Sequence, residues 1–380
     1  MNMCQAGMSG RPMRHWEGIL VKRLSSFSLF ANPAPLLVSR QALFPGVIRL
    51  ADGRLLALFS IGQAFDAADM RSFVSTSEDD GHSWSEPRRL NSREAVPEEQ
   101  ESFKPILLRD GRLLATGYVF ERPDPLQPIV DPVTLALPRL VPKMAVSGDG
   151  GESWSVPQPI RLDGEPPLEM SGPATQLPSG RIIAATSPFH LQPSGHSGWI
   201  VASDDGGRRW FKLSEFFRAP GEDIHAWECR LVAWGEGRVA VLWWAYDHTR
   251  GVNLNNHIAF SADGGETFGP AIDTGVPGQS SSLIHLEGET LLTIHAQRDK
   301  DAGLFVRRVD VTGDRFDIRD ELELFADGAM GSTTADMKQQ FGDLKFGQPS
   351  LLRLNETELL AYCWAVEAHQ YIIKAFRLSL

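Results

Sequence analysis

The chain has 380 residues, of which 42% are hydrophobic, and a formal net charge of −11 at neutral pH. This acidic balance argues against nucleic acid or an anionic membrane surface as a partner. No apolar run reaches the length of a membrane span, and residues 1–14 lack the apolar centre of a signal peptide. The widely spaced Cys4, Cys229 and Cys363 suit free thiols in a reducing compartment. We therefore expect a cytoplasmic protein, with a start further upstream that carries a signal sequence as the alternative.

Apolar hairpins recur along the chain. Each consists of an apolar strand, a polar turn and a second apolar strand, and Asp-Gly between apolar runs is a strong hairpin signal. The six instances cover residues 46–57, 105–115, 174–184, 231–241, 283–292 and 351–360. Six hairpins of this kind predict six copies of one supersecondary unit, which is typical of the blades of a β-propeller.

A second pattern follows four of these hairpins. Ser77-x-Asp79-x-Gly81-x-x-Trp84 recurs from Ser147 and Ser203, and once more from Ser261 with Phe in place of Trp. Asp accepts hydrogen bonds from nearby backbone N–H groups and Gly permits positive φ, so each copy predicts a rigid turn with the aromatic ring packed beneath it. A calcium loop is the alternative, but the copies supply too few carboxylates for the ligand set of an EF-hand.

Three segments depart from the repeat. Residues 309–316 are a degenerate fifth copy, residues 120–142 are rich in proline and predict an irregular loop, and residues 317–345 predict an insertion with a short helix near 335–340. The sixth blade ends after its third strand, at 371–376. Because an open strand edge invites aggregation, we expect an N-terminal segment, either 19–24 or 35–38, to supply the missing outer strand.

Together these patterns predict an all-β fold, namely a six-bladed β-propeller of four-stranded antiparallel blades whose ring is closed by an N-terminal strand. The unbroken repeats favour a single domain over residues 15–380, preceded by an N-terminal extension over residues 1–14 for which we predict no ordered structure.

The four turn copies resemble the Asp-box, or BNR repeat, of the sialidase (neuraminidase) superfamily, and the likeness spans roughly residues 40–377. The resemblance implies the same propeller, with the Asp-box turns away from the active site. The substrate would lie on the opposite face, which is built by the loops that enter the first strand of each blade and leave its second strand.

Acids, histidines and aromatic residues are frequent in the loops of that expected face. Aromatic faces stack on sugar rings, and a pair of carboxyl groups can cleave a glycosidic bond, so we predict Glu228 with Asp66 or Asp69 as the catalytic pair. The predicted substrate-binding residues are Arg71, Trp227, Tyr246, Asp247, His248, His295, Arg298, Gln348 and Glu367. Other acids and histidines of these loops are Glu99, Glu101, Glu169, His190 and His196. The alternatives are core packing for the tryptophans and ordinary loop polarity for the rest.

The resemblance also implies three arginines that bind the carboxylate of sialic acid and a tyrosine nucleophile activated by a glutamate. Leu43-Phe44-Pro45 stands where the family has its first arginine, and Ala245-Tyr246 where it has its second. Gln348-Pro349-Ser350 takes the place of the tyrosine. This sequence therefore lacks most of the carboxylate-binding set and resembles a divergent, sialidase-like branch.

Other positions keep the family pattern. Glu228 resembles the family's glutamate, Asp66 or Asp69 lies near the place of its acid/base aspartate, and Arg298 is the one remnant of an arginine cluster. We therefore predict a sialidase-like carbohydrate-active enzyme, an exo-acting glycoside hydrolase on a terminal sugar other than an ordinary sialic acid. Its partner would be a small saccharide or the end of a glycan.

Three alternatives stay open. One is a genuine exo-α-sialidase with a rearranged arginine cluster, and another is a non-catalytic glycan-binding propeller. The third is a uronate-directed polysaccharide lyase that uses Tyr246 or His248 as its base and Arg298 to neutralise the uronate. No set of His, Cys and Asp that is close in sequence has the spacing of a metal site, so we expect neither a metal nor another cofactor.

Overall fold

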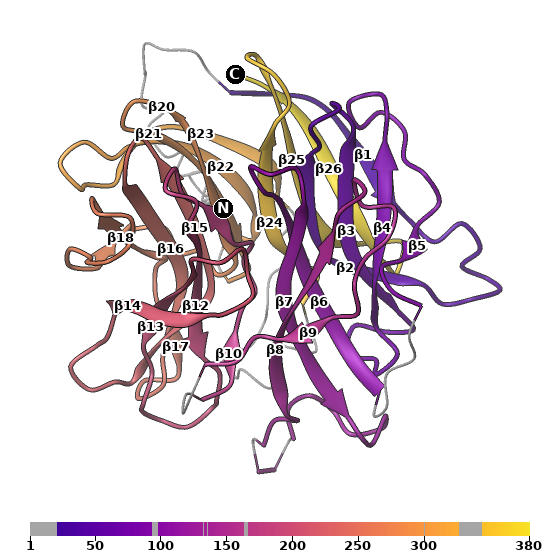
Figure 1. The fold of residues 1–380 in the computed structure, drawn as a ribbon, viewed down its shortest axis with the longest axis horizontal. Helices are drawn as coiled ribbons and strands as arrows, with labels where there is room; N and C mark the ends of the chain where they lie inside the picture. The colour runs from indigo at the N-terminus through magenta and orange to yellow at the C-terminus, as the bar shows by residue number, and fades with distance from the viewer. Residues whose placement is uncertain are drawn as a thin grey trace, which may run out of the picture.

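The computed structural model describes residues 21–92, 98–131, 133–134, 136–162, 166–299, 301–326 and 344–380. The strands in these ranges form six antiparallel sheets (Figure 1). The protein is therefore a six-bladed β-propeller, which confirms the predicted fold. Within the described residues we find no helix with the length and apolarity that a membrane crossing requires.

The first three blades follow one another along the chain. Blade one consists of β2 (Gln41–Arg49), β3 (Leu55–Gly62), β4 (Arg71–Ser77) and β5 (Arg88–Arg89). Blade two consists of β6 (Glu98–Leu107), β7 (Leu113–Arg122), β8 (Leu140–Ser147) and β9 (Gln158–Pro159). Blade three has an interrupted first strand, and its members are β10 (Leu168–Glu169), β11 (Thr175–Gln176), β12 (Ile182–Pro188), β13 (Gly198–Ser203) and β14 (Phe211–Phe217).

The remaining blades keep the same order. Blade four consists of β15 (Ile224–Trp234), β16 (Arg238–Asp247), the short β17 (Val252–Asn253), β18 (His257–Ser261) and β19 (Ile272–Asp273). Blade five consists of β20 (Ser281–Glu287), β21 (Thr290–Gln297), β22 (Gly303–Asp310) and β23 (Asp317–Ala326). Blade six consists of β24 (Phe346–Arg353), β25 (Glu358–Glu367), β26 (Gln370–Ser379) and β1 (Lys22–Phe30).

The N-terminal strand closes the ring. β1, indigo in Figure 1, pairs antiparallel with the yellow β26 from Lys22 opposite Ser379 to Phe30 opposite Ile373. The closing strand therefore includes the end of the predicted 19–24 segment, whereas residues 35–37 form a turn and not a strand. Pairing the two ends of the chain removes the open edge that blade six would otherwise expose.

The predicted insertion at 317–345 is wrong in its first part. Residues Asp317–Ala326 are the outer strand of blade five and pair with β22 along its length. Charged residues fill the exposed side of this edge strand, which hides its apolar alternation, but Leu324 is fully buried between blades five and six. The helix predicted near 335–340 lies outside the described residues.

The core lies between neighbouring blades. The side chains of β3, the second strand of blade one, alternate between the two sides of the sheet, so they reach both neighbouring blades. Leu55, Ala57 and Phe59 pack against blade six, whereas Leu56 and Leu58 pack against blade two. All eight residues of β3 are buried, so a strand in this position reads as a continuous apolar run.

The repeated turns form one end of the propeller. In the first copy, the Ser77 hydroxyl accepts from Gly81 N at 2.8 Å and donates to Asp79, whose Oδ1 accepts from Ser83 N at 2.9 Å. The other three copies have the same Gly N to Ser Oγ bond, at 2.9 Å. The β2–β3 hairpin and the turn share this end, since Arg49, the last residue of β2, donates to Asp80 in the turn at 2.7 Å.

Candidate active site

A cavity of about 620 Å³ opens at the other end of the propeller. The pairing of β2 with β3 defines the two ends, because Arg49 and Leu55 meet at the turn end and Gln41 and Gly62 meet at the cavity end. Loops that enter first strands and leave second strands supply the lining, as the sequence predicted. Its polar and charged residues include Asp66, Gln100, Glu101, Ser102, Glu169, Glu228, Arg298 and Gln348.

Three first strands carry the same irregularity where they reach the cavity. In β2, β15 and β24 the register shifts, and the shifted residue has positive φ although it is not glycine. The three residues are Phe44 (57°), Glu228 (47°) and Gln348 (42°), and all three line the cavity. Positive φ at residues with a Cβ costs of order 1–3 kcal/mol, and such strain concentrates at functional sites. The bulges therefore direct three side chains toward one space.

A hydrogen bond from a neighbouring blade holds each bulge. Lys104 Nζ in blade two donates to Phe44 O at 2.8 Å, and Glu228 N donates to Glu169 Oε2 of blade three at 3.2 Å. Gln348 N donates to Ser280 Oγ, just before blade five, at 2.9 Å. These contacts offset the backbone strain, so each bulge depends on the closed ring and not on its own strand alone.

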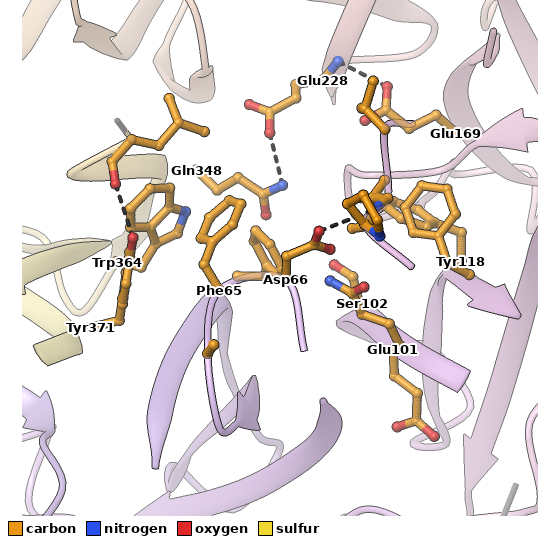
Figure 2. Close-up of a pocket in the computed structure, with 18 of the residues that line it drawn as sticks. Phe65, Asp66, Glu101, Ser102, Tyr118, Glu169, Glu228, Gln348, Trp364 and Tyr371 are labelled. Carbon is orange, nitrogen blue, oxygen red and sulfur yellow. Dashed lines mark hydrogen bonds between the residues drawn. The ribbon is translucent and has the colours of Figure 1, made fainter. Parts of the chain in front are cut away.

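Glu228 and Gln348 point toward each other across the cavity (Figure 2). Gln348 Nε2 donates to Glu228 Oε1 at 2.9 Å, which joins blades six and four. The second oxygen of each side chain, Glu228 Oε2 and Gln348 Oε1, is buried without a hydrogen-bond partner. A buried acceptor that lacks a partner is destabilising by about 1–3 kcal/mol, so both atoms are placed to receive hydrogen bonds from a bound molecule.

Glu169 lies beside Glu228 at the edge of the same network (Figure 2). Burial, together with the nearby charge of Glu228, raises the pKa of Glu169 to about 8. Glu169 therefore carries a proton at neutral pH. The two neighbouring glutamates differ in environment, and such pairs are where acid and base roles separate.

Asp66 reaches the cavity from the β3–β4 loop. Its Oδ2 accepts from Ile129 N at 2.9 Å, and its Oδ1 accepts from the buried guanidinium of Arg122 at 3.2 Å. Burial raises the pKa of Asp66 despite these bonds. Asp66 thus faces the cavity while it ties the loop of blade one to the proline-rich loop of blade two.

Arg298 is the one arginine or lysine in the described lining of the cavity. Its Nε donates to Phe346 O at 2.9 Å, and its guanidinium lies 5.8 Å from the ring centre of Trp244 and 5.9 Å from that of Trp364. Gly347 makes room for it, because a Cβ at that position would lie 2.0 Å from Arg298 Nη2. The strand before the Gln348 bulge therefore needs glycine.

Aromatic rings form much of the remaining wall. Phe65 contacts Phe44, Trp364 and Tyr371 at ring-centre distances of 5.6–5.9 Å. On the opposite side, Trp227 packs edge-on against Trp244 at 4.8 Å. Apolar ring faces beside carboxyl groups are the surfaces that stack on the faces of a sugar ring.

Five of the twelve predicted residues line the cavity, namely Asp66, Trp227, Glu228, Arg298 and Gln348. Asp69 and Arg71 do not line the cavity. Asp69 accepts from Gln63 N, and Arg71 donates to Ala68 O in its own loop and to Glu99 O in blade two. Their predicted roles stay predictions, but their contacts are those of residues that shape the loop.

The other predicted residues lie behind or away from the cavity. Tyr246 stacks on the far side of Trp227 at 4.9 Å, Asp247 accepts from Arg250 N, and His248 belongs to a stack of histidines. His295 is fully buried between Asn256 and Thr293, to which its ring nitrogens bond at 2.8 and 2.9 Å. Glu367 pairs with Lys374 at the surface.

Several lining residues were not among the predicted site residues. Glu169 has the same sequence signal as Glu228, an acid at the entrance to the first strand of a blade. Phe65, Tyr118 and Tyr371 also line the cavity. A single aromatic residue in a loop has no signal that separates a cavity wall from the core, so the sequence could not identify these three.

Comparison with known proteins finds no matching family model and no matching curated protein. Solved structures do match. A protein of unknown function from Dyadobacter fermentans is 22% identical, with a TM-score of 0.75 over 95% of this chain and 99% of that one. The NanB sialidase from Streptococcus pneumoniae is 15% identical, with a TM-score of 0.61 over 90% and 69%. This chain has the sialidase fold.

A further match is to a sialidase-type structure that this chain covers almost completely. The intramolecular trans-sialidase from Ruminococcus gnavus is 14% identical, with a TM-score of 0.60 over 90% of this chain and 95% of that one. The predicted resemblance to sialidases is thus confirmed at the level of fold, at an identity that marks a divergent branch. Fold alone does not fix the reaction, which must be argued from the cavity.

Proposed function

We propose that this protein is an exo-acting glycoside hydrolase that removes a terminal sugar other than an ordinary sialic acid. The main support is the pair Glu228 and Glu169, held by a strained bulge in an aromatic-lined cavity on a sialidase-type propeller. A cavity of about 620 Å³ has room for one or two sugar rings, which suits the end of a glycan.

The two glutamates suit the two roles of glycoside hydrolysis. Glu169, which holds its proton at neutral pH, donates that proton to the glycosidic oxygen as the bond to the anomeric carbon breaks. Glu228 either attacks the anomeric carbon or removes a proton from the attacking water, and the water oxygen ends on the released sugar. Asp66 is the alternative donor, but both of its oxygens already accept hydrogen bonds.

The lining favours a sugar without the carboxylate of sialic acid. The stretch that replaces the family's first arginine contributes the ring of Phe44 to the cavity. Trp244, next to the stretch that replaces the second arginine, contributes another apolar surface. Arg298 alone supplies a guanidinium in the described lining, which is enough to bind one hydroxyl pair or one anionic group.

A panel of fluorogenic glycosides tests this proposal. The purified protein is assayed with umbelliferyl derivatives of neutral hexoses, amino sugars, uronic acids and sialic acid. We expect turnover of at least one derivative other than the sialoside, and a loss of about 100-fold or more in Glu228→Gln, the scale on which enzymes depend on acid–base groups.

Glu101→Gln is the matched control. Glu101 also lines the cavity, but its Oε2 accepts from Ser72 N at 2.8 Å, and Figure 2 shows its carboxyl directed away from Glu228. We expect it to keep most of the activity. Cleavage of the sialoside alone would instead indicate a true sialidase, and an unsaturated product absorbing in the ultraviolet would indicate a lyase. Binding without turnover, unchanged in Glu228→Gln, would leave a glycan-binding propeller.

A further inference from the structure

Four histidines meet behind the cavity, where blades three and four join. His190 and His196 lie in the β12–β13 loop, His225 lies in β15, and His248 follows β16. The ring of His196 lies 4.5 Å from those of His190 and His225 and 4.1 Å from that of His248. Loops from two blades thus bring together imidazoles that are far apart in the sequence.

The backbone holds these loops in place. His196 N donates to Glu222 O and His248 N donates to Asp223 O, both at 2.9 Å. The same short turn before β15 therefore positions histidines of blade three and blade four. His225 is the second residue of β15, the strand that carries Trp227, and the two rings lie 4.7 Å apart. Backbone hydrogen bonds and ring contacts therefore hold the histidine cluster at the junction of blades three and four.

The histidines keep ring nitrogens without partners. His196 Nε2 bonds to Gln192 O at 2.7 Å and must donate there, so His196 Nδ1 carries a lone pair. His196 Nδ1, His225 Nδ1 and His248 Nε2 are all buried and have no hydrogen-bond partner. His196 and His225 are fully buried as residues. Orphaned nitrogens of this kind are rare in native proteins and indicate a missing ligand.

Neutral imidazole is the commonest protein ligand for transition metals, and the burial of these rings disfavours their protonated form.

We propose that His196, His225 and His248 bind a divalent transition-metal ion of the zinc class. Each offers one ring nitrogen, and these nitrogens lie within 4.8 Å of one another. Zinc binds imidazole nitrogen at about 2.0–2.1 Å, so the nitrogens on one tetrahedral ion lie about 3.4 Å apart. The rings turn from their stacked arrangement about the bonds to Cβ when the ion binds. His190, next in the stack and with Nδ1 also unpartnered, is available as a fourth ligand.

Cobalt titration tests the site without any substrate. The full chain, treated with a chelator and then freed of it, is titrated with Co²⁺ and then with Zn²⁺. We expect the visible absorption of a Co²⁺ ion in a four-coordinate site to saturate at one ion per chain, and Zn²⁺ to displace it. Zn²⁺ is also expected to raise the melting temperature, because it binds the folded state.

Variants decide whether these histidines are the ligands. His196→Gln and His248→Gln should each weaken Co²⁺ binding at least ten-fold, and the half-buried His248 is the variant that keeps the fold if His196→Gln does not. His82→Gln, at an exposed histidine in the first turn copy, should bind as the unchanged protein does. Absence of the cobalt spectrum, or a spectrum that His248→Gln leaves unchanged, would overturn the proposal. Since neither readout needs turnover, its failure leaves the proposed hydrolase untouched.

Discussion

The two ends of the propeller treat their buried polar groups in opposite ways. At the turn end, four copies of one hydrogen-bond pattern satisfy serine, aspartate and glycine with nearly the same distances. At the cavity end, buried atoms without a partner gather: Trp227 Nε1, Glu228 Oε2, Gln348 Oε1, Trp364 Nε1 and the nitrogens of the histidine cluster. Among the described residues, the turn end has few, such as Arg49 Nε and Trp234 Nε1. Repetition thus serves stability, and unsatisfied groups mark where ligands are expected.

Backbone conformation shows the same division. The turns place glycine at positive φ, as at Gly81, Gly151, Gly207 and Gly265, where the absence of Cβ makes the conformation inexpensive. The cavity end instead forces Phe44, Glu228 and Gln348 into positive φ. Asp80 (57°), in the first turn copy, is an exception, but aspartate adopts this conformation more readily than most residues. At the cavity, by contrast, the strained residues are ones whose side chains line the proposed site.

Gly347→Ala should have the largest effect, because it damages the cavity end in two ways. The added Cβ would lie 2.0 Å from Arg298 Nη2 and 2.8 Å from Trp364 Cζ2, so the guanidinium must leave its place. We expect a stability loss of about 1–3 kcal/mol in urea unfolding, as for other overpacked cores, together with a strong fall in turnover. Gly148→Ala, at the turn end with open space around it, is the control. Equal behaviour of the two variants would remove the packing argument for Arg298.

Ser147→Ala should damage the turn end alone. Ser147 is buried, its Oγ accepts from Gly151 N at 2.9 Å, and it donates to Asp149 at 2.8 Å. Leaving the buried Gly151 N–H without an acceptor should destabilise the fold by about 1–3 kcal/mol. Turnover per folded molecule should not change, and Ser26→Ala, on the exposed side of β1, should change neither quantity. A large loss of turnover in Ser147→Ala at a temperature where it is folded would contradict the division of the two ends.

Sequence reasoning predicted the turn end far better than the cavity end. The turns repeat locally, so Ser77, Asp79, Gly81 and Trp84 define one structure within eight residues, and three further copies support it. Hairpin spacing then gives the six blades, and the unpaired third strand of blade six gives the closing N-terminal strand. The one error in the described part, the outer strand of blade five, arose because charges mask its alternation.

The cavity could be predicted only as a list of loops. Which loop residues point inward depends on the bulges at Phe44, Glu228 and Gln348, and a bulge has no clear sequence signal when the strained residue is not glycine. Of the predicted site residues, Glu228 and Gln348 line the cavity, whereas His295 and Glu367 lie elsewhere, and the roles of all four stay predictions. The sequence named His190, His196 and His248 as loop residues but not as one cluster, because the members come from three segments that meet only in the folded ring.

The last expected effect concerns pH, and it separates the two ends by sign. The pKa of Glu169 in the folded protein is about 8, against an ordinary value of 4.5. Its carboxyl group is protonated in both states below pH 4.5, so its contribution to stability is fully present there and is lost as pH rises toward 8. Glu169→Gln cannot ionise. The melting temperature of this variant should therefore rise relative to that of the unchanged protein between pH 5 and 8, by a few degrees, because a chain of 380 residues shifts by only about 1–2 °C per kcal/mol.

The turn end should respond in the other direction. Hydrogen bonds from Ser153 and Ser147 lower the pKa of Asp149 to about 2, so its contribution is present above the ordinary value of 3.8 and is lost as pH falls toward 2. Because the raised pKa belongs to Glu169, the melting temperature of Glu169→Gln should diverge from that of the unchanged protein on the alkaline side and follow it below pH 5. The exposed Glu236→Gln is the control. A constant difference from pH 5 to 9 would show that Glu169 is ionised in the folded state, and it would transfer the role of proton donor to Asp66.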